Sequence, residues 1–190
     1  LLLAEQAPPT ANILVLGAGG GLELKAFAQA QPRWRFVGVD PSAEMLDQAS
    51  RILGPLRTQV ELKQGFIDAA PSGPFDGATC LLTLHFLSKV ERLRTLGEIR
   101  RRLRPGARFV VAHHSYPENG DVTLWLSRSL AFAGRSAVDL ARAPVSAAAM
   151  ADRLPILSAS EDEAQIREAG FLDVALFYAG FSFRGWIATA

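Results

Sequence analysis

The chain has 190 residues, of which 49% are hydrophobic, and a formal net charge of +1. This size and composition suffice for one globular domain with its own core, so we expect residues 1–190 to form a single domain. The small net charge gives no field that would attract nucleic acid or an anionic membrane, and no apolar run approaches the ~18 residues of a membrane-spanning helix. One cysteine, Cys80, excludes an internal disulfide and predicts a cytoplasmic location. Because the first residue is Leu1 rather than methionine, we expect further residues before it in the natural protein.

The first predicted strand is the apolar run from Ile13 to Leu16, which suits a strand buried on both faces of a parallel sheet. Glycines follow at positions 17, 19 and 21, where they allow the backbone to turn sharply and to approach a ligand closely. A helix is expected over residues 22–30, ending before Pro32.

The second predicted strand, residues 34–39, is followed by Asp40, which lies 23 residues after Gly17. A carboxylate near this spacing can accept hydrogen bonds from ribose hydroxyls. A dinucleotide-binding loop needs a glycine at the sixth position of its motif, which is Leu22 here. The spacing G-x-G-x-G therefore favours an adenosine cofactor without a pyrophosphate. A nicotinamide oxidoreductase is disfavoured for the same reason and by the lack of a Tyr-x-x-x-Lys pair.

Strands and helices continue to alternate through the middle of the chain. Ser42 is expected to cap a helix that ends at Gly54 and Pro55, and a basic amphipathic helix is expected over residues 88–103, stopped by Pro105 and Gly106. Further strands are predicted at residues 58–63, 75–82 and 107–112. This alternation predicts a parallel sheet with helices on both faces. Ligands bind such sheets at the carboxyl ends of the strands, so residues 17, 40, 66–68 and 81–85 should line one crevice.

The pattern changes near Asn119. Residues 119–157 are helical in composition and predict an inserted helical lid. A helix with a capping box of Ser160 and Glu163 should follow and end at Gly170. Two strand-like runs, 171–179 and 181–189, predict a closing antiparallel hairpin. The expected fold is α/β and Rossmann-like: a seven-stranded, mostly parallel sheet with a C-terminal antiparallel hairpin and a helical lid insertion.

Three segments resemble signatures of the class I S-adenosylmethionine (SAM) methyltransferases: Gly17-Ala18-Gly19-Gly20-Gly21, Val37 to Ser42 with Met45-Leu46, and Leu103-Arg104-Pro105-Gly106. The resemblance covers residues 13–190. Within this class, residues 81–87, 169–171 and 181–183 are similar to the carboxy-SAM synthase group, which acts in tRNA wobble-uridine modification.

The resemblance implies SAM as cofactor and a role for each matched residue. The glycine loop would pass the methionine part of SAM, Asp40 would hold the ribose hydroxyls beside Pro41, and residues 66–68 would form the adenine wall. The backbone near Leu82 would meet the methionine ammonium or the sulfonium. The implied cofactor-binding residues are Gly17, Ala18, Gly19, Asp40, Pro41, Met45, Phe66, Ile67, Asp68, Leu82 and Thr83.

Departures from the family pattern bear on the choice of function. Val15 and Phe66 stand where many of these enzymes carry an acid, which leaves open a SAM-binding module without catalysis. The arginine that would bind a carboxylated cofactor falls within residues 147–149, which are alanines. We therefore favour a SAM-dependent methyltransferase with a small-molecule acceptor, over a carboxy-SAM synthase-like enzyme.

Methyl transfer from a sulfonium requires alignment of the acceptor and exclusion of water more than a fixed set of catalytic groups. His85 either faces the methyl group or packs under the lid, while His113 and His114 should point to opposite sides of their strand. No metal site is expected. Cys80 should be a buried packing thiol.

The basic run of residues 100–104 lies at a helix C-terminus, where cations meet the negative end of the helix dipole. We interpret it as a solvated helix end rather than a nucleic-acid site, and we expect no nucleic-acid partner. The apolar lid and hairpin leave a homodimer open.

Overall fold

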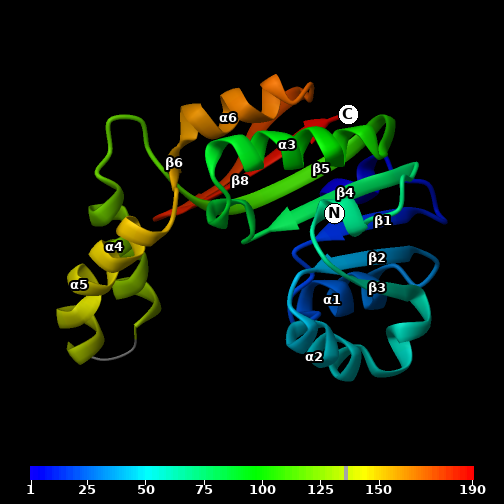
Figure 1. Ribbon diagram of the computed structural model, residues 1–190, viewed down its shortest axis with the longest axis horizontal. Coiled ribbons are helices and arrows are strands. Elements are labelled where there is room, and N and C mark those ends of the chain that lie inside the picture. Colours follow the sequence, from blue (N-terminus) through cyan, green and yellow to red (C-terminus); the bar gives the residue numbers. More distant parts are fainter. Residues whose placement is uncertain (135–136) are drawn as a thin grey trace.

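A computed structural model describes residues 1–134 and 137–190 (Figure 1). The strands are β1 Asn12–Leu16, β2 Arg35–Asp40, β3 Val60–Gln64, β4 Phe75–Leu81, β5 Leu103–Tyr116, β6 Leu157–Ser158, β7 Leu172–Gly180 and β8 Phe183–Thr189. The α-helices are α1 Leu22–Ala30, α2 Ala43–Leu53, α3 Lys89–Arg101, α4 Val122–Ala133, α5 Ala137–Arg153 and α6 Ala159–Glu168. Short 3-10 turns occur at η1 Leu2–Glu5, η2 Gly54–Gln59, η3 Ile67–Ala69 and η4 Leu84–Phe86.

The described strands form one sheet in the order β3-β2-β1-β4-β5-β8-β7, with the two-residue β6 paired to the end of β5. Neighbouring strands from β3 to β5 are parallel, whereas β8 runs antiparallel to both β5 and β7. The predicted mostly parallel sheet with a C-terminal antiparallel hairpin is confirmed. Chain order reverses between β1 and β4, which is the position where such sheets bind ligands.

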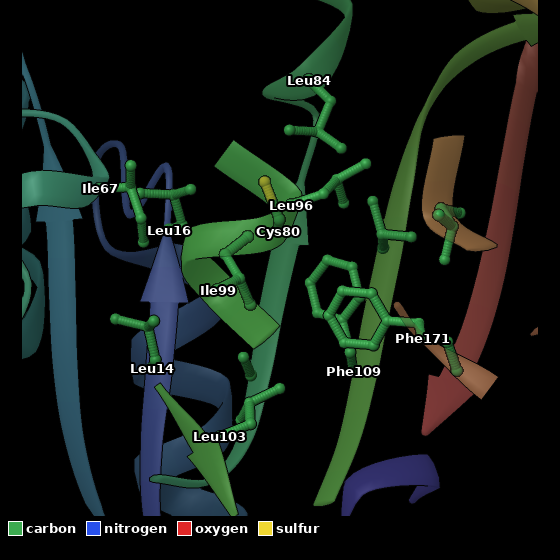
Figure 2. Packing of buried hydrophobic residues seen from close by; sticks show 14 of the residues in the cluster. Leu14, Leu16, Ile67, Cys80, Leu84, Leu96, Ile99, Leu103, Phe109 and Phe171 are labelled. Atoms are coloured by element: carbon green, nitrogen blue, oxygen red, sulfur yellow. The ribbon is translucent and has the colours of Figure 1, made fainter. Parts of the chain in front are cut away.

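Strand β1 shows why its sequence is a continuous apolar run. Ile13 and Val15 pack on one face of the sheet, toward α1 and α2, and Leu14 and Leu16 pack on the other, toward α3 and α6. Figure 2 shows the second of these cores, in which Leu14 and Leu16 lie with the aliphatic side chains of α3. Helices therefore cover both faces of the strand that leads into the glycine loop, and they hold its carboxyl end rigidly.

The end of α3 differs from the prediction. The helix ends at Arg101, and β5 already begins at Leu103, which pairs with Phe75 of β4. Strand β5 continues through Pro105 and Gly106, and its register with β4 shifts at this point. Pairing with a neighbouring strand thus converts the expected helix stop into an irregularity inside a long strand.

The capping box of α6 was predicted two residues too late. Its N-cap is Ser158, whose side chain and Glu161 satisfy each other's backbone N–H groups. Both Ser158 and Ser160 are followed by a glutamate three residues later, so the sequence pattern alone fits either. Pairing of β6 with β5 holds Ser158 in extended backbone, which selects it as the cap.

Most of the predicted lid region, residues 119–157, consists of α4 and α5, which pack against each other. Asp121 caps α4 by accepting hydrogen bonds from the Thr123 and Leu124 N–H groups. Residues 135 and 136, also within the predicted lid, lie outside the described part. Figure 1 shows this helix pair beyond the end of the sheet toward which β4 points. Among the described helices, none is long and apolar enough to cross a membrane.

Candidate functional site

A cleft of about 840 Å³ opens at the carboxyl ends of β1, β2 and β4. This volume is in the range of sites for drug-sized ligands and cofactors. The residues predicted to bind the cofactor line it, with the exception of Asp68: Gly17, Ala18, Gly19, Asp40, Pro41, Met45, Phe66, Ile67, Leu82 and Thr83. The sheet topology thus brings together segments that are far apart in sequence.

The glycine loop is held close to two neighbouring elements. Gly17 has a φ of +77°, and a Cβ on it would lie 1.8 Å from Thr83 Oγ1. Gly21 has a φ of +81°, and its Cβ would lie 2.8 Å from Ala49 Cα in α2. Only glycine fits both positions, because each combines left-handed backbone with close approach. The resulting loop leaves its backbone, rather than side chains, facing the cleft.

Asp40 connects the loop to the end of β2. One carboxylate oxygen accepts a hydrogen bond from Gly19 N at 2.9 Å, and the other accepts one from Ser42 N at 3.0 Å. The Val39 carbonyl accepts two more, from Gly17 N and Ala18 N. Each carboxylate oxygen retains a second lone pair, so Asp40 can still accept hydrogen bonds from a ligand. Its position is fixed before any ligand arrives.

The loop after β3 forms the opposite wall of the cleft. Ile67 is 1% exposed and joins the core, whereas Phe66 is 64% exposed beside the cleft. Asp68 points elsewhere: its carboxylate pairs with both terminal nitrogens of Arg94, at 3.1 and 2.8 Å. Arg94 holds the pKa of this carboxyl below its usual range. The structure therefore leaves Asp68 outside the cleft lining, while Arg94 takes a place in it.

The end of β4 turns abruptly into the cleft. Leu82 adopts a φ of +56°, and its N–H donates to the Ala112 carbonyl at 2.6 Å. Thr83 Oγ1 donates to the Leu81 carbonyl at 3.0 Å. Left-handed backbone is costly for leucine and is found mostly where tertiary contacts enforce it, often at functional sites.

Sequence reasoning missed one titratable group in the cleft. Glu23, in the first turn of α1, lines the cleft and accepts a hydrogen bond from Thr79 Oγ1 at 2.5 Å. Burial raises the pKa of its carboxyl to about 7, and the Thr79 hydrogen bond only partly opposes this. An acid in the helix turn that follows a glycine loop is the sequence signal that could have indicated it.

The three histidines are not among the residues that line the cleft. His85, in η4, is 4% exposed, and its Nδ1 lies 3.4 Å from the His114 N–H that donates to it. Burial lowers the pKa of His85 to about 3, so the ring is neutral at physiological pH. His114 bonds to Ser182, whereas His113 contacts Asp162 with its Nε2, and each contact lies on a different element. The prediction that the two adjacent histidines diverge is confirmed. No cluster with metal-ligand chemistry occurs among the described residues.

The interpretation of Cys80 as a buried packing thiol is confirmed, and that of the basic run, residues 100–104, is partly corrected. Cys80 is fully buried, and burial raises the pKa of its thiol. Arg101 pairs with Glu98 at 2.8 Å, and Arg104 pairs with Asp76 at 3.0 Å. Arg102 corrects the picture of a wholly solvated helix end, because it is 4% exposed and also pairs with Glu98. Much of the positive charge of this run is therefore paired with carboxylates of the protein itself.

Comparisons with known proteins agree with this geometry. The sequence matches the family described as a methyltransferase domain over residues 14–109. The demethylmenaquinone methyltransferase of Symbiobacterium thermophilum is 34% identical over 114 residues, which are 57% of this chain and 45% of that protein. The chain spans less than half the length of the curated relatives that it matches.

Two solved structures share the fold. An O-methyltransferase family protein from Burkholderia thailandensis aligns with a TM-score of 0.75 at 16% identity, over 100% of this chain and 52% of that one. An O-methyltransferase family 2 protein from Planctomyces limnophilus, solved in complex with apigenin, aligns with a TM-score of 0.70 at 19% identity, over 94% of this chain and 49% of that one. The family match covers the end of β1, the glycine loop, Asp40 and β4, and on this ground the chain belongs to the class I SAM-dependent methyltransferases.

Proposed function

We propose that this protein transfers the methyl group of SAM to a small-molecule acceptor. The observation that carries the proposal is the cleft at the β1–β4 switch point, where Asp40 and the glycine loop are fixed by mutual hydrogen bonds. The ten cleft-lining residues of the predicted set would bind the cofactor. Its adenosine end would lie between Asp40 and the wall formed by Phe66 and Ile67. Its methionine end would lie between the glycine loop and Thr83.

Methyl transfer requires mainly that the protein aligns the acceptor with the cofactor. SAM would supply the methyl group: the acceptor would attack the methyl carbon in line with the carbon–sulfur bond, which breaks as SAH leaves. The walls of the cleft would hold the cofactor and exclude water, while the acceptor approaches from the open side. A general base is needed only for an acceptor that loses a proton.

We do not assign His85 as that base, because its buried ring lies outside the cleft lining. It lies two residues after Thr83, in a 3-10 turn whose other members include the cleft-lining Phe86. Its Nδ1 already accepts a hydrogen bond from the His114 N–H, so the neutral ring carries its proton on Nε2 and has no free lone pair. A pKa near 3 also makes the ring a weak base.

A small acceptor is supported by the comparisons: the relatives named above act on demethylmenaquinone or were solved with apigenin bound. The α4–α5 pair would form the lid over such an acceptor within a single domain. It brings aromatic side chains toward the C-terminal hairpin, since the Phe132 and Phe181 ring centroids lie 4.8 Å apart. A homodimer and a cytoplasmic location are further parts of the proposal, suggested by the exposed Phe132 and by the single cysteine.

Carboxy-SAM synthesis has less support than ordinary methyl transfer. Residues 147–149, where the arginine for the extra carboxylate would align, are alanines of α5, and Ala147 is fully buried. A non-catalytic SAM-binding module would keep the cleft without turnover, and it is separated from the main proposal by assay.

The test is calorimetric titration of the purified chain with SAM and S-adenosylhomocysteine (SAH), followed by an acceptor screen with methyl-labelled SAM over phenols, quinones and carboxylic acids. We expect saturable binding of both cofactors and label transfer to one acceptor class. Asp40→Ala should abolish binding, whereas Asp47→Asn, an exposed change in α2 outside the cleft, should not. Absence of SAM binding would overturn the proposal, and binding without transfer to any acceptor would favour the non-catalytic module.

A further inference from the structure

Glu23 is the cleft residue with the least evident structural role. Its carboxyl is partly buried, and the described side chain that bonds to it is the Thr79 hydroxyl of β4. A buried carboxylate is costly unless it is paired with a cation. Within the described residues no cation pairs with Glu23.

The other charged groups of the cleft do not fill this role. Those that line it are Asp40 from β2 and Glu91 and Arg94 from α3. Arg94 is engaged by Asp68, and Glu91 accepts hydrogen bonds from Ser88 at the start of α3. Cys80, adjacent to Thr79, has a thiol whose pKa is raised by burial and is therefore neutral. The cleft thus holds three carboxyl groups for one engaged guanidinium, and it favours a positively charged ligand.

The sheet places Glu23 at one end of this cleft. Thr79 pairs in register with Val15 of β1, so the Glu23 carboxyl lies on the β4 side of the glycine loop. Asp40 lies on the other side of the loop, at the end of β2. A ligand whose ribose contacts Asp40 therefore extends its far end across the loop toward Glu23 and β4.

We propose that the Glu23 carboxylate binds the α-ammonium group of the methionine part of SAM. This inference rests on the proposed function, since it takes the cleft to be the cofactor site. An ammonium donates three hydrogen bonds, and a carboxylate that already accepts one from Thr79 has lone pairs left for it. The sulfonium has no hydrogen to donate, so the ammonium is the better match.

Cofactor binding then changes the protonation of Glu23. In the empty cleft the carboxyl is about half protonated near pH 7, because burial raises its pKa to about 7. A bound ammonium stabilises the carboxylate and drives the proton into solution. SAM affinity should therefore rise with pH through neutrality, and each binding event should release part of a proton.

The test compares wild type, Glu23→Gln and Glu44→Gln by calorimetric titration with SAM and SAH between about pH 6 and pH 8. Glutamine keeps an oxygen for the Thr79 hydroxyl but carries no charge. We expect Glu23→Gln to weaken binding of both ligands roughly tenfold near pH 8 and far less near pH 6. Glu44, exposed in the first turn of α2 and outside the cleft lining, is the matched control and should bind as wild type.

Proton release gives a second readout that does not depend on the variant. Wild-type binding heats near pH 7 should differ between buffers of different ionisation enthalpy, and the difference should shrink in Glu23→Gln. Equal affinities and equal pH profiles for wild type and Glu23→Gln would overturn this inference while leaving the proposed function intact. So would weaker binding of SAM with unchanged SAH, because both ligands carry the ammonium. Failure of wild type to bind either ligand would instead sink the proposed function itself.

Discussion

The two halves of the molecule are determined by different kinds of interaction, one local and one between distant segments. From β1 to α2 the chain is governed by local requirements: a run of buried aliphatic residues, glycines in left-handed backbone, and a serine cap. From β5 to α6 it is governed by distant partners, such as the pairing of β6 with β5 and the buried ion pair of Arg92 with Asp162. The first half forms the glycine loop, and the second half attaches a helix pair and a hairpin to the same sheet. The comparison teaches that local sequence determines the glycine loop, whereas contacts between distant segments determine the later part of the chain.

The largest expected effect is on the free energy of unfolding and leaves SAM binding unchanged. Asp162 of α6 contacts both Arg92 of α3 and His113 of β5, and all three side chains are 1% exposed. Asp162→Asn leaves the Arg92 guanidinium buried without its counter-charge, so we expect unfolding to become easier by about 3–5 kcal/mol. Urea denaturation measures the change. Glu168→Gln, exposed on the same helix, should show almost none.

This variant also tests the division between the halves. SAM affinity of folded Asp162→Asn should stay within about twofold of wild type, since the pair lies outside the cleft lining. A large loss of affinity at a temperature where the variant is folded would show that the two halves are coupled.

The next effect concerns binding. Gly17→Ala puts a Cβ into the space of the Thr83 side chain and forces alanine to a φ of +77°. We expect loss of SAM binding together with a destabilisation of about 2 kcal/mol or more. Gly97→Ala is the matched control, because a Cβ there meets nothing within 4 Å and the residue lies inside α3. That change should stabilise the protein by roughly 0.5–1 kcal/mol. Equal behaviour of the two variants would show that the loop geometry is not required.

A smaller effect appears in the pH dependence of apoprotein stability. The native state keeps a proton on Glu23 up to about pH 7, whereas the unfolded chain releases it near the ordinary value of 4.5. The native state thus binds more protons in this window, so its stability falls as pH rises from about 5 to 7. Glu23→Gln should remove this loss and be more stable than wild type near pH 8, on the order of 1–2 kcal/mol. Denaturation curves at several pH values measure this difference in stability. If wild type gained stability relative to the variant between about pH 5 and pH 7, the raised pKa of Glu23 would be contradicted.

The smallest effect is expected at Asp68. Its pair with Arg94 is exposed, with 60% and 56% of the side chains accessible, so screening by water leaves little to lose. Asp68→Asn should change neither the unfolding midpoint nor SAM affinity measurably. A clear loss of SAM affinity would return Asp68 to the cofactor site and show that the ion pair opens when the ligand binds.

Prediction from the sequence succeeded where a residue type has few alternatives. Gly17 and Gly21 stand at positions that exclude a Cβ, and the run from Ile13 to Leu16 is buried on both faces. The sequence patterns of these residues therefore predict the local structure directly. Prediction failed where two local solutions were equivalent. Ser158 and Ser160 offer the same capping pattern, and only the pairing of β6 with β5 selects between them.

The sequence by itself determined the order of strands and helices, the sharp turn after β1 and the acid at the end of β2, because backbone sterics and alternation of apolar residues act over short distances. Only the tertiary structure decided the positions of two acidic side chains relative to the cleft. It turned Asp68 away toward Arg94 and brought Glu23 of α1 against Thr79 of β4. Both outcomes depend on competition for partners between segments far apart in the chain, and such competition is resolved only when the sheet has assembled.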